Sequence, residues 1–188
     1  MSSELYHAIA LEAARRGASS PSELWAAMEL IEAQSRKRVI VDIGSEPAVV
    51  WAWWSLGAQV ISVPQGETAA GPFGGRVPET VTEIVADPRE RDTALRVSDQ
   101  LAQRFADVLV VGHADTEESA RTVFHAYAPM VRPGGLILVN HIADPMAPWV
   151  KQFWHSLDAC GGRRIVARDR PCGYGIVEIH GRDKASHG

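Results

Sequence analysis

Short runs of β-branched residues recur along this chain, and segments with helical spacing separate most of them. Such runs are typical of strands that are buried on both faces of a sheet. They lie at residues 39–41, 58–63, 81–85, 107–111 and 136–139. Strands that alternate with helices form right-handed βαβ units and a mostly parallel sheet. The sequence therefore predicts an α/β fold with a doubly wound sheet.

Two further runs follow near the end of the sequence, at residues 164–167 and 175–179, with no helix between them. Strands that are joined directly must pair as a hairpin, which places one antiparallel strand near the C-terminus. With this hairpin, the predicted sheet has about seven strands.

Apolar residues at helical spacing predict two helices before the first strand. Their apolar faces are marked by Leu5, Ile9 and Ala13 in the first helix and by Leu24, Met28 and Ile31 in the second. We expect these helices to cover an edge or the mouth of the sheet. Later helices are predicted at residues 47–56, 116–130 and 148–157, and another carries Leu95, Val97 and Leu101. A tight turn is predicted at residues 133–135.

The segment at residues 47–56 is apolar on nearly every side, so the helix that it forms must be buried. We interpret its residues Trp51, Trp53 and Trp54 as core packing rather than as a surface for substrate. Trp149 lies near the predicted mouth of the sheet and could line a substrate pocket.

With 188 residues, 46% of them hydrophobic, the chain suits a single domain with a full core. We expect N-terminal helices over residues 1–36, an α/β core over 37–181 and a tail over 182–188. The formal net charge of −4 gives no general attraction to nucleic acid or to an anionic membrane. The basic run at residues 36–38 is interpreted as a solvated helix end.

The start of the sequence lacks the basic segment and apolar run of a signal peptide, and no apolar stretch approaches the ~20 residues of a membrane helix. The cytoplasm is therefore the expected location. Cys160 and Cys172 form neither a disulfide framework nor the spacing of a zinc site.

Ligands of doubly wound sheets bind beyond the carboxyl ends of the strands. The sharpest set of polar residues there is His113, Asp115, His141 and Asp144, which follow the fourth and fifth strands. Histidine can act as a base or bind a metal, and aspartate can orient the histidine or share the metal. The alternative is that they are ordinary polar residues of surface loops. A loop rich in Gly and Pro at residues 65–78 opens from the same edge.

Gly44, after the first strand, allows close approach of the backbone, and the buried helix directs its N-terminus into the crevice. Glu46 occupies the position of an anion there, and Pro47 removes an amide donor. A cofactor without phosphate therefore fits this place better than a phosphate does. The alternative is that Gly44 serves only a tight turn.

Five stretches between residues 39 and 179 share their order and spacing with a known family. They are Val41-Asp42-Ile43-Gly44-Ser45, Gly71-Pro72-Phe73-Gly74-Gly75, Ile84-Val85-Ala86-Asp87 with Pro88, residues 109–116, and Val131-Arg132-Pro133-Gly134-Gly135-Leu136-Ile137. Together they resemble the class I S-adenosylmethionine-dependent methyltransferases, and within them the cephalosporin-hydroxylase-like and small-molecule O-methyltransferase group. The resemblance implies a Rossmann-like methyltransferase fold and S-adenosylmethionine as the cofactor.

The resemblance also assigns roles to residues of the predicted site. The cofactor-binding residues that it implies are Asp42, Gly44, Ser45, Glu67 and Asp87. His141 or His113 would take the proton from a substrate hydroxyl as the methyl group moves. Asp115 and His141 would hold a divalent metal such as magnesium. The implied substrate is a small hydroxylated molecule.

Several positions depart from the family pattern. Pro47 or Ala48 holds the place of the family's second glycine, and the second strand leads into Gln65 without the acid that binds the ribose. At the fourth strand, Gly112, His113 and Ala114 replace the family's acids and Asp115 is displaced, and at the fifth, Asn140-His141 replaces the His-Asp pair. A missing ribose acid removes a charge-assisted hydrogen bond of about 1.5–3 kcal/mol.

The sequence leaves three functions open. The first is a working methyltransferase, which we favour by a small margin. The second is a catalytically inactive relative that serves as a binding or structural module in an assembly. The third is an enzyme of another class, in which His113, Asp115 and His141 hold a metal. The expected partner is a small-molecule substrate and neither nucleic acid nor a membrane, and a homo-oligomer or protein assembly stays open.

Overall fold

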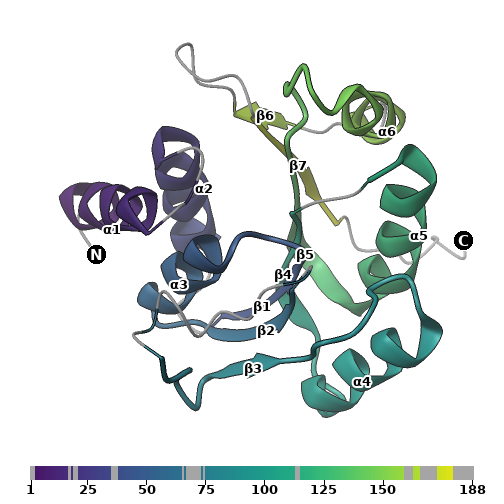
Figure 1. Ribbon diagram of the computed structural model, residues 1–188, viewed down its shortest axis with the longest axis horizontal. Helices are drawn as coiled ribbons and strands as arrows, with labels where there is room; N and C mark the ends of the chain where they lie inside the picture. Colours follow the sequence, from purple (N-terminus) through teal and green to yellow (C-terminus); the bar gives the residue numbers. More distant parts are fainter. Residues whose placement is uncertain are drawn as a thin grey trace, which may run out of the picture.

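The computed structural model describes residues 3–16, 18, 21–34, 38–64, 66, 73, 75–112, 115–158, 163–165 and 173–179. In this part of the chain, seven strands form one sheet (Figure 1). They are β1 (Val39–Ile43), β2 (Gln59–Val63), β3 (Val81–Glu83), β4 (Ala106–Val111), β5 (Val131–Asn140), β6 (Arg163–Ile165) and β7 (Tyr174–Glu178). Their order across the sheet is β3-β2-β1-β4-β5-β7-β6.

The sheet is mostly parallel, as the alternation of strands and helices predicts. β1 pairs in parallel with β2 and β4, β2 with β3, and β4 with β5. β7 runs antiparallel to both β5 and β6, which confirms the predicted antiparallel strand near the C-terminus. The strand order reverses between β1 and β4, so the carboxyl ends of these strands mark the expected ligand crevice.

Helices cover both faces of the sheet (Figure 1). One layer contains α1 (Ser3–Arg15), α2 (Pro21–Gln34) and α3 (Pro47–Ser55), and the other contains α4 (Arg91–Leu101), α5 (Glu117–Tyr127) and α6 (Pro148–Asp158). Successive strand residues alternate between the layers: Ile40 packs with the first and Val41 with the second. Among the described helices, none has the length and apolar character that crossing a bilayer requires.

The helix α3 is buried, as its apolar sequence predicts. Trp53 has no exposed surface and belongs to the core of this face. Trp51 and Trp54 are partly buried against the same core. The Arg16 guanidinium lies 4.6 Å from the centre of the Trp51 ring. The three tryptophans of α3 therefore serve packing, in agreement with the interpretation from sequence.

The helices α1 and α2 join the core on the α3 face: α1 packs against α2 and α3, and α2 also contacts the edge strand β6, in agreement with the expected position at an edge. The predicted apolar face of α2 is confirmed, since Leu24, Met28 and Ile31 are buried. In α1, however, Tyr6 is buried and Leu5 is 42% exposed, so the predicted burial of Leu5 is wrong. Both residues fit the helical spacing, and the side on which α2 and α3 pack determines which of the two is buried.

β3 and β5 both differ from their predicted bounds. β3 ends at Glu83, and Val85, which was expected inside the strand, is 60% exposed. The predicted turn at residues 133–135 instead lies inside β5, whose register with β4 shifts after Ala106. The reason is additional pairing: Gly134 N donates to Ile179 O at 2.6 Å, and Ile179 N donates to Gly135 O at 2.9 Å.

Arg38 is buried, so the interpretation of the basic run as a solvated helix end is wrong for this residue. Its guanidinium forms an ion pair with Glu32 and donates to Leu56 O at 3.2 Å. Burial lowers the pKa of this guanidinium. Residues 36 and 37 lie outside the described residues.

Candidate functional site

The turn after β1 is held from inside by Asp42. Its carboxylate has no exposed surface. Oδ1 accepts a hydrogen bond from Ser45 N at 3.1 Å, and Oδ2 accepts one from Trp53 Nε1 at 2.7 Å. Burial raises the pKa of this carboxyl group to about 6, and the hydrogen bonds from Ser45 and Trp53 oppose the rise. Asp42 therefore braces the turn against α3 without reaching solvent.

The same turn is bonded tightly to β2 and β4. Gly44, with a φ of +79°, donates its amide to Val63 O at 2.9 Å. Gly112 N donates to Ile43 O at 2.8 Å. A Cβ added to Gly112 would lie 2.4–2.5 Å from three atoms of Ser45, so the close approach requires glycine. The amides of Gly44, Ser45 and Gly112 are thus all bonded within the protein.

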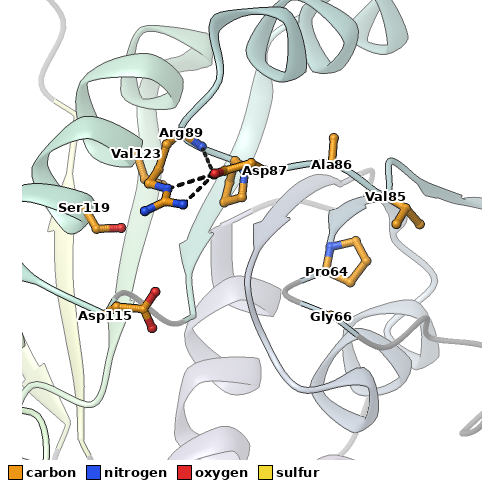
Figure 2. Close-up of a pocket in the computed structure, with 10 residues that line it drawn as sticks. Pro64, Gly66, Val85, Ala86, Asp87, Arg89, Asp115, Ser119 and Val123 are labelled. Atoms are coloured by element: carbon orange, nitrogen blue, oxygen red, sulfur yellow. Dashed lines mark hydrogen bonds and ion pairs between the residues drawn. The ribbon is translucent and has the colours of Figure 1, made fainter.

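A cavity of about 280 Å³ opens at the carboxyl edge of the sheet, beyond β2, β3 and β4 (Figure 2). Figure 2 shows residues that follow β2 and β3 on one side of the cavity and residues of the β4–α5 segment on the other. The lining residues are Pro64, Gly66, Val85, Ala86, Asp87, Pro88, Arg89, Asp115, Ser119 and Val123. Apolar walls with a few polar groups are typical of a small-molecule site.

An ion pair forms part of the cavity wall. Asp87 Oδ1 accepts from Arg89 N at 2.9 Å, and Arg89 Nη2 donates to Asp87 Oδ2 at 2.6 Å (Figure 2). These hydrogen bonds lower the pKa of Asp87 to about 2, so the carboxylate stays ionised near neutral pH. Arg89 was not anticipated from the sequence. Its only signal was a basic residue two positions after a strand-end aspartate.

A His–Asp pair follows β5. His141 has a φ of +63°, and its amide donates to Asn140 Oδ1 at 2.8 Å. His141 Nδ1 lies 3.2 Å from Asp144 Oδ2, while Asp144 Oδ1 accepts from Met146 N at 2.8 Å. The backbone of the loop thus fixes Asp144, and Asp144 orients the imidazole.

The structure separates the residues expected to bind the cofactor. Asp87 lines the cavity, whereas Asp42, Gly44 and Ser45 form the buried turn and do not line it. Glu67 lies outside the described residues. Direct cofactor contact by any of these residues stays a prediction.

The residues expected for catalysis and metal binding are also separated. Asp115 lines the cavity, and His141 is paired with Asp144 beyond β5. His113 lies outside the described residues, as do Cys160 and Cys172. Within the part of the chain that is described, no three His, Cys, Asp or Glu side chains gather as a metal site requires. The proposed metal set stays a prediction. Trp149 is partly buried against the core of the α4–α6 face.

The sequence matches no family model and no curated protein. Solved structures do share its fold. The MycE methyltransferase of mycinamycin biosynthesis, solved with Mg and SAH, is 15% identical over 87% of this chain and 50% of its own, with a TM-score of 0.61. The O-methyltransferase TomG from Streptomyces achromogenes, solved with SAM, is 17% identical over 94% of this chain and 90% of its own, with a TM-score of 0.61. An rRNA methylase from Streptococcus thermophilus is 12% identical over 85% of this chain and 97% of its own, with a TM-score of 0.62.

The chain therefore has the Rossmann-like fold of the class I methyltransferases. It spans about half the length of MycE. Identities of 12–17% establish the fold alone. Because one similar structure is an O-methyltransferase and another an rRNA methylase, the fold does not choose the substrate, and the site must do so.

The carboxyl edge fits one half of S-adenosylmethionine more closely than the other. The cavity has apolar walls for a base and an ionised acceptor, Asp87, for polar groups of a nucleoside. The amides of Gly44 and Ser45 are already bonded to Val63 O and Asp42, so they are not available to the amino-acid half. The nucleoside half therefore fits the described residues.

Proposed function

We propose that this protein is an S-adenosylmethionine-dependent methyltransferase that transfers a methyl group to the hydroxyl of a small molecule. The observation that carries the proposal is the cavity beyond β2, β3 and β4, with the ionised Asp87 on its wall. Its place agrees with the rule that doubly wound sheets bind ligands at the carboxyl ends of their strands. MycE and TomG, which share the fold, were solved with SAH and SAM.

Residues on both walls of the cavity would contact S-adenosylmethionine. When bound, S-adenosylmethionine supplies a methyl group that is activated by a positively charged sulfur. Asp87 would accept hydrogen bonds from the nucleoside, and Arg89 would hold the Asp87 carboxylate in one orientation. Asp115 and Ser119, on the far wall, would contact the same ligand.

His141 is the proposed general base. Because Nδ1 lies against Asp144, the proton of a substrate hydroxyl would go to Nε2, and Asp144 would stabilise the imidazolium that forms. Methyl transfer needs mainly positioning and one base, so a site that departs from the family pattern can still serve. His113 is the second candidate base, and with His113 in that role Asp115 and His141 are the candidate pair for a magnesium ion.

One observation favours a second candidate function, that of an inactive methyltransferase-like module in an assembly. The end of β4 closes on the turn after β1, since Gly112 packs directly on Ser45. The amides that could approach a ligand at the strand-order reversal are already bonded within the protein. We favour the enzyme because the neighbouring cavity stays open.

Calorimetric titration with S-adenosylmethionine and S-adenosylhomocysteine, each with and without magnesium, tests the proposal. Micromolar binding, which corresponds to about −8 kcal/mol, is the result expected of a methyltransferase. A magnesium-dependent increase in affinity would support the metal pair. Absence of heat and of thermal stabilisation at millimolar ligand would contradict the enzyme and favour the inactive module.

A further inference from the structure

Glu23, in the first turn of α2, is a carboxylate without exposed surface. Its Oε1 accepts a hydrogen bond from Gly173 N at 2.9 Å. Gly173 comes directly before β7, and because β7 runs antiparallel to β5, the start of β7 lies beside the end of β5. A buried hydrogen bond therefore connects α2 to the segment beside the strand end that carries His141.

Gly173 in turn holds the residue that follows His141. Gly173 O accepts a hydrogen bond from Ile142 N at 3.3 Å, while Asn140 pairs with Tyr174. His141 therefore lies between Asn140 and Ile142, and both of these residues pair with the segment 173–174. Its φ of +63° is a conformation that a residue other than glycine keeps only where the surroundings impose it.

We propose that Glu23 is a positioning residue for His141. By accepting from Gly173 N, it fixes the segment that holds Ile142, keeps the His141 turn left-handed and so keeps the imidazole against Asp144. The side-chain oxygen of Glu23 supplies the acceptor that this buried backbone amide requires. The catalytic meaning of this contact rests on the proposed function, whereas the positioning can be measured without cofactor.

The test is NMR on the isotope-labelled full chain, comparing the wild type with Glu23→Ala and Glu23→Gln. In Glu23→Ala, Gly173 N loses its buried acceptor, so we expect the ring signals of His141 to move. The Ile142 amide should also exchange with solvent at least roughly tenfold faster. Glu23→Gln keeps an oxygen acceptor at the same reach and should restore the wild-type signals.

Met28→Ala provides the matched control, because Met28 is buried in the same helix and takes no part in the contact with Gly173. This variant should lower the melting temperature through a cavity and leave the His141 signals unchanged. The proposal is overturned if Glu23→Ala leaves those signals in place, or if Met28→Ala moves them equally. Should Glu23→Ala fail to fold, Glu23→Asp replaces it: a smaller shift in the His141 signals is expected, and unchanged signals overturn the proposal.

Failure of the proposed function would look different. Glu23 is not among the residues that line the cavity, so titration of Glu23→Gln with S-adenosylhomocysteine should give the wild-type affinity. A wild-type protein that binds no S-adenosylhomocysteine would contradict the methyltransferase and leave the His141 measurement unaffected.

Discussion

Burial and hydrogen bonding act in opposite directions on the carboxyl group of Asp42. Two donors, Ser45 N and Trp53 Nε1, favour the ionised form, whereas complete burial favours the protonated form and has the larger effect. The pKa of Asp42 therefore rises from 3.8 to about 6. At neutral pH the fold must contain a buried carboxylate, which costs stability.

The contribution of Asp42 to the free energy of unfolding should fall as the pH rises from about 4 to above 6. The native carboxyl group binds its proton more tightly than the unfolded one, so its stabilising effect is present at low pH and lost as the pH passes its native pKa. The change in pKa corresponds to roughly 3 kcal/mol. Urea unfolding at a series of pH values, for the wild type and Asp42→Asn, measures it. Equal pH slopes for the two proteins would contradict the prediction.

Asp87 should carry much of the affinity for the nucleoside. Replacing it with Asn removes a charge-assisted acceptor, so S-adenosylhomocysteine should bind more weakly, by roughly tenfold. Asp99→Asn is the matched control, because Asp99 lies on α4 and does not line the cavity. Calorimetric titration of both variants with S-adenosylhomocysteine measures the difference. Equal affinities of the two variants would show that Asp87 does not bind the nucleoside.

Residues at strand ends can be predicted from the sequence, but their hydrogen-bond partners cannot. Asp87 was predicted through the family resemblance of the segment that it ends, whereas its pairing with Arg89 depends on a local turn. The burial of Asp42 against Trp53 likewise depends on which face of β1 meets α3. Periodicity along the chain specifies neither the local turn nor the packing of β1 against α3.

The turn between β1 and α3 connects the carboxyl ends of β1, β2 and β4. It is bonded to β2 through Gly44 and to β4 through Gly112. Periodicity predicted α3 and the strands before β5 to within two residues, whereas β5 begins five residues earlier than predicted. Periodicity could not predict whether Leu5 or Tyr6 is buried in α1, because both residues fit the helical spacing. The direction from which α2 and α3 pack against α1 determines which of them is buried.

Gly112→Ala should destabilise the protein by about 1–3 kcal/mol, because the added methyl group meets backbone and side-chain atoms of Ser45 at 2.4–2.5 Å. Gly57→Ala is the comparison variant, because it introduces backbone strain without a steric clash. Gly57 has a φ of +76° and nothing within 4 Å of an added Cβ, so only the cost of roughly 1–2 kcal/mol for a left-handed alanine applies. Denaturant unfolding compares the two. A Gly112→Ala protein as stable as the wild type would show that the turn can move away from β4.

For the whole molecule, the alternation of strands and helices was enough to predict the doubly wound sheet and its antiparallel strand. The contact between Glu23 of α2 and Gly173 was not predictable, because it joins residues 150 positions apart in the sequence. The function is harder still to predict from the sequence. The fold is shared by an O-methyltransferase and an rRNA methylase, and the residues of this site depart from the family pattern.

The central claim is that the cavity beyond β2, β3 and β4 holds a nucleoside cofactor. The most direct test is NMR mapping of the isotope-labelled full chain during titration with S-adenosylhomocysteine. We predict that amide signals change at Gly66, Ala86, Asp87, Arg89 and Ser119, which line the cavity, and that signals of α1 stay in place. Signals that do not change at millimolar ligand, or that change only in α1 and α2, would contradict the account.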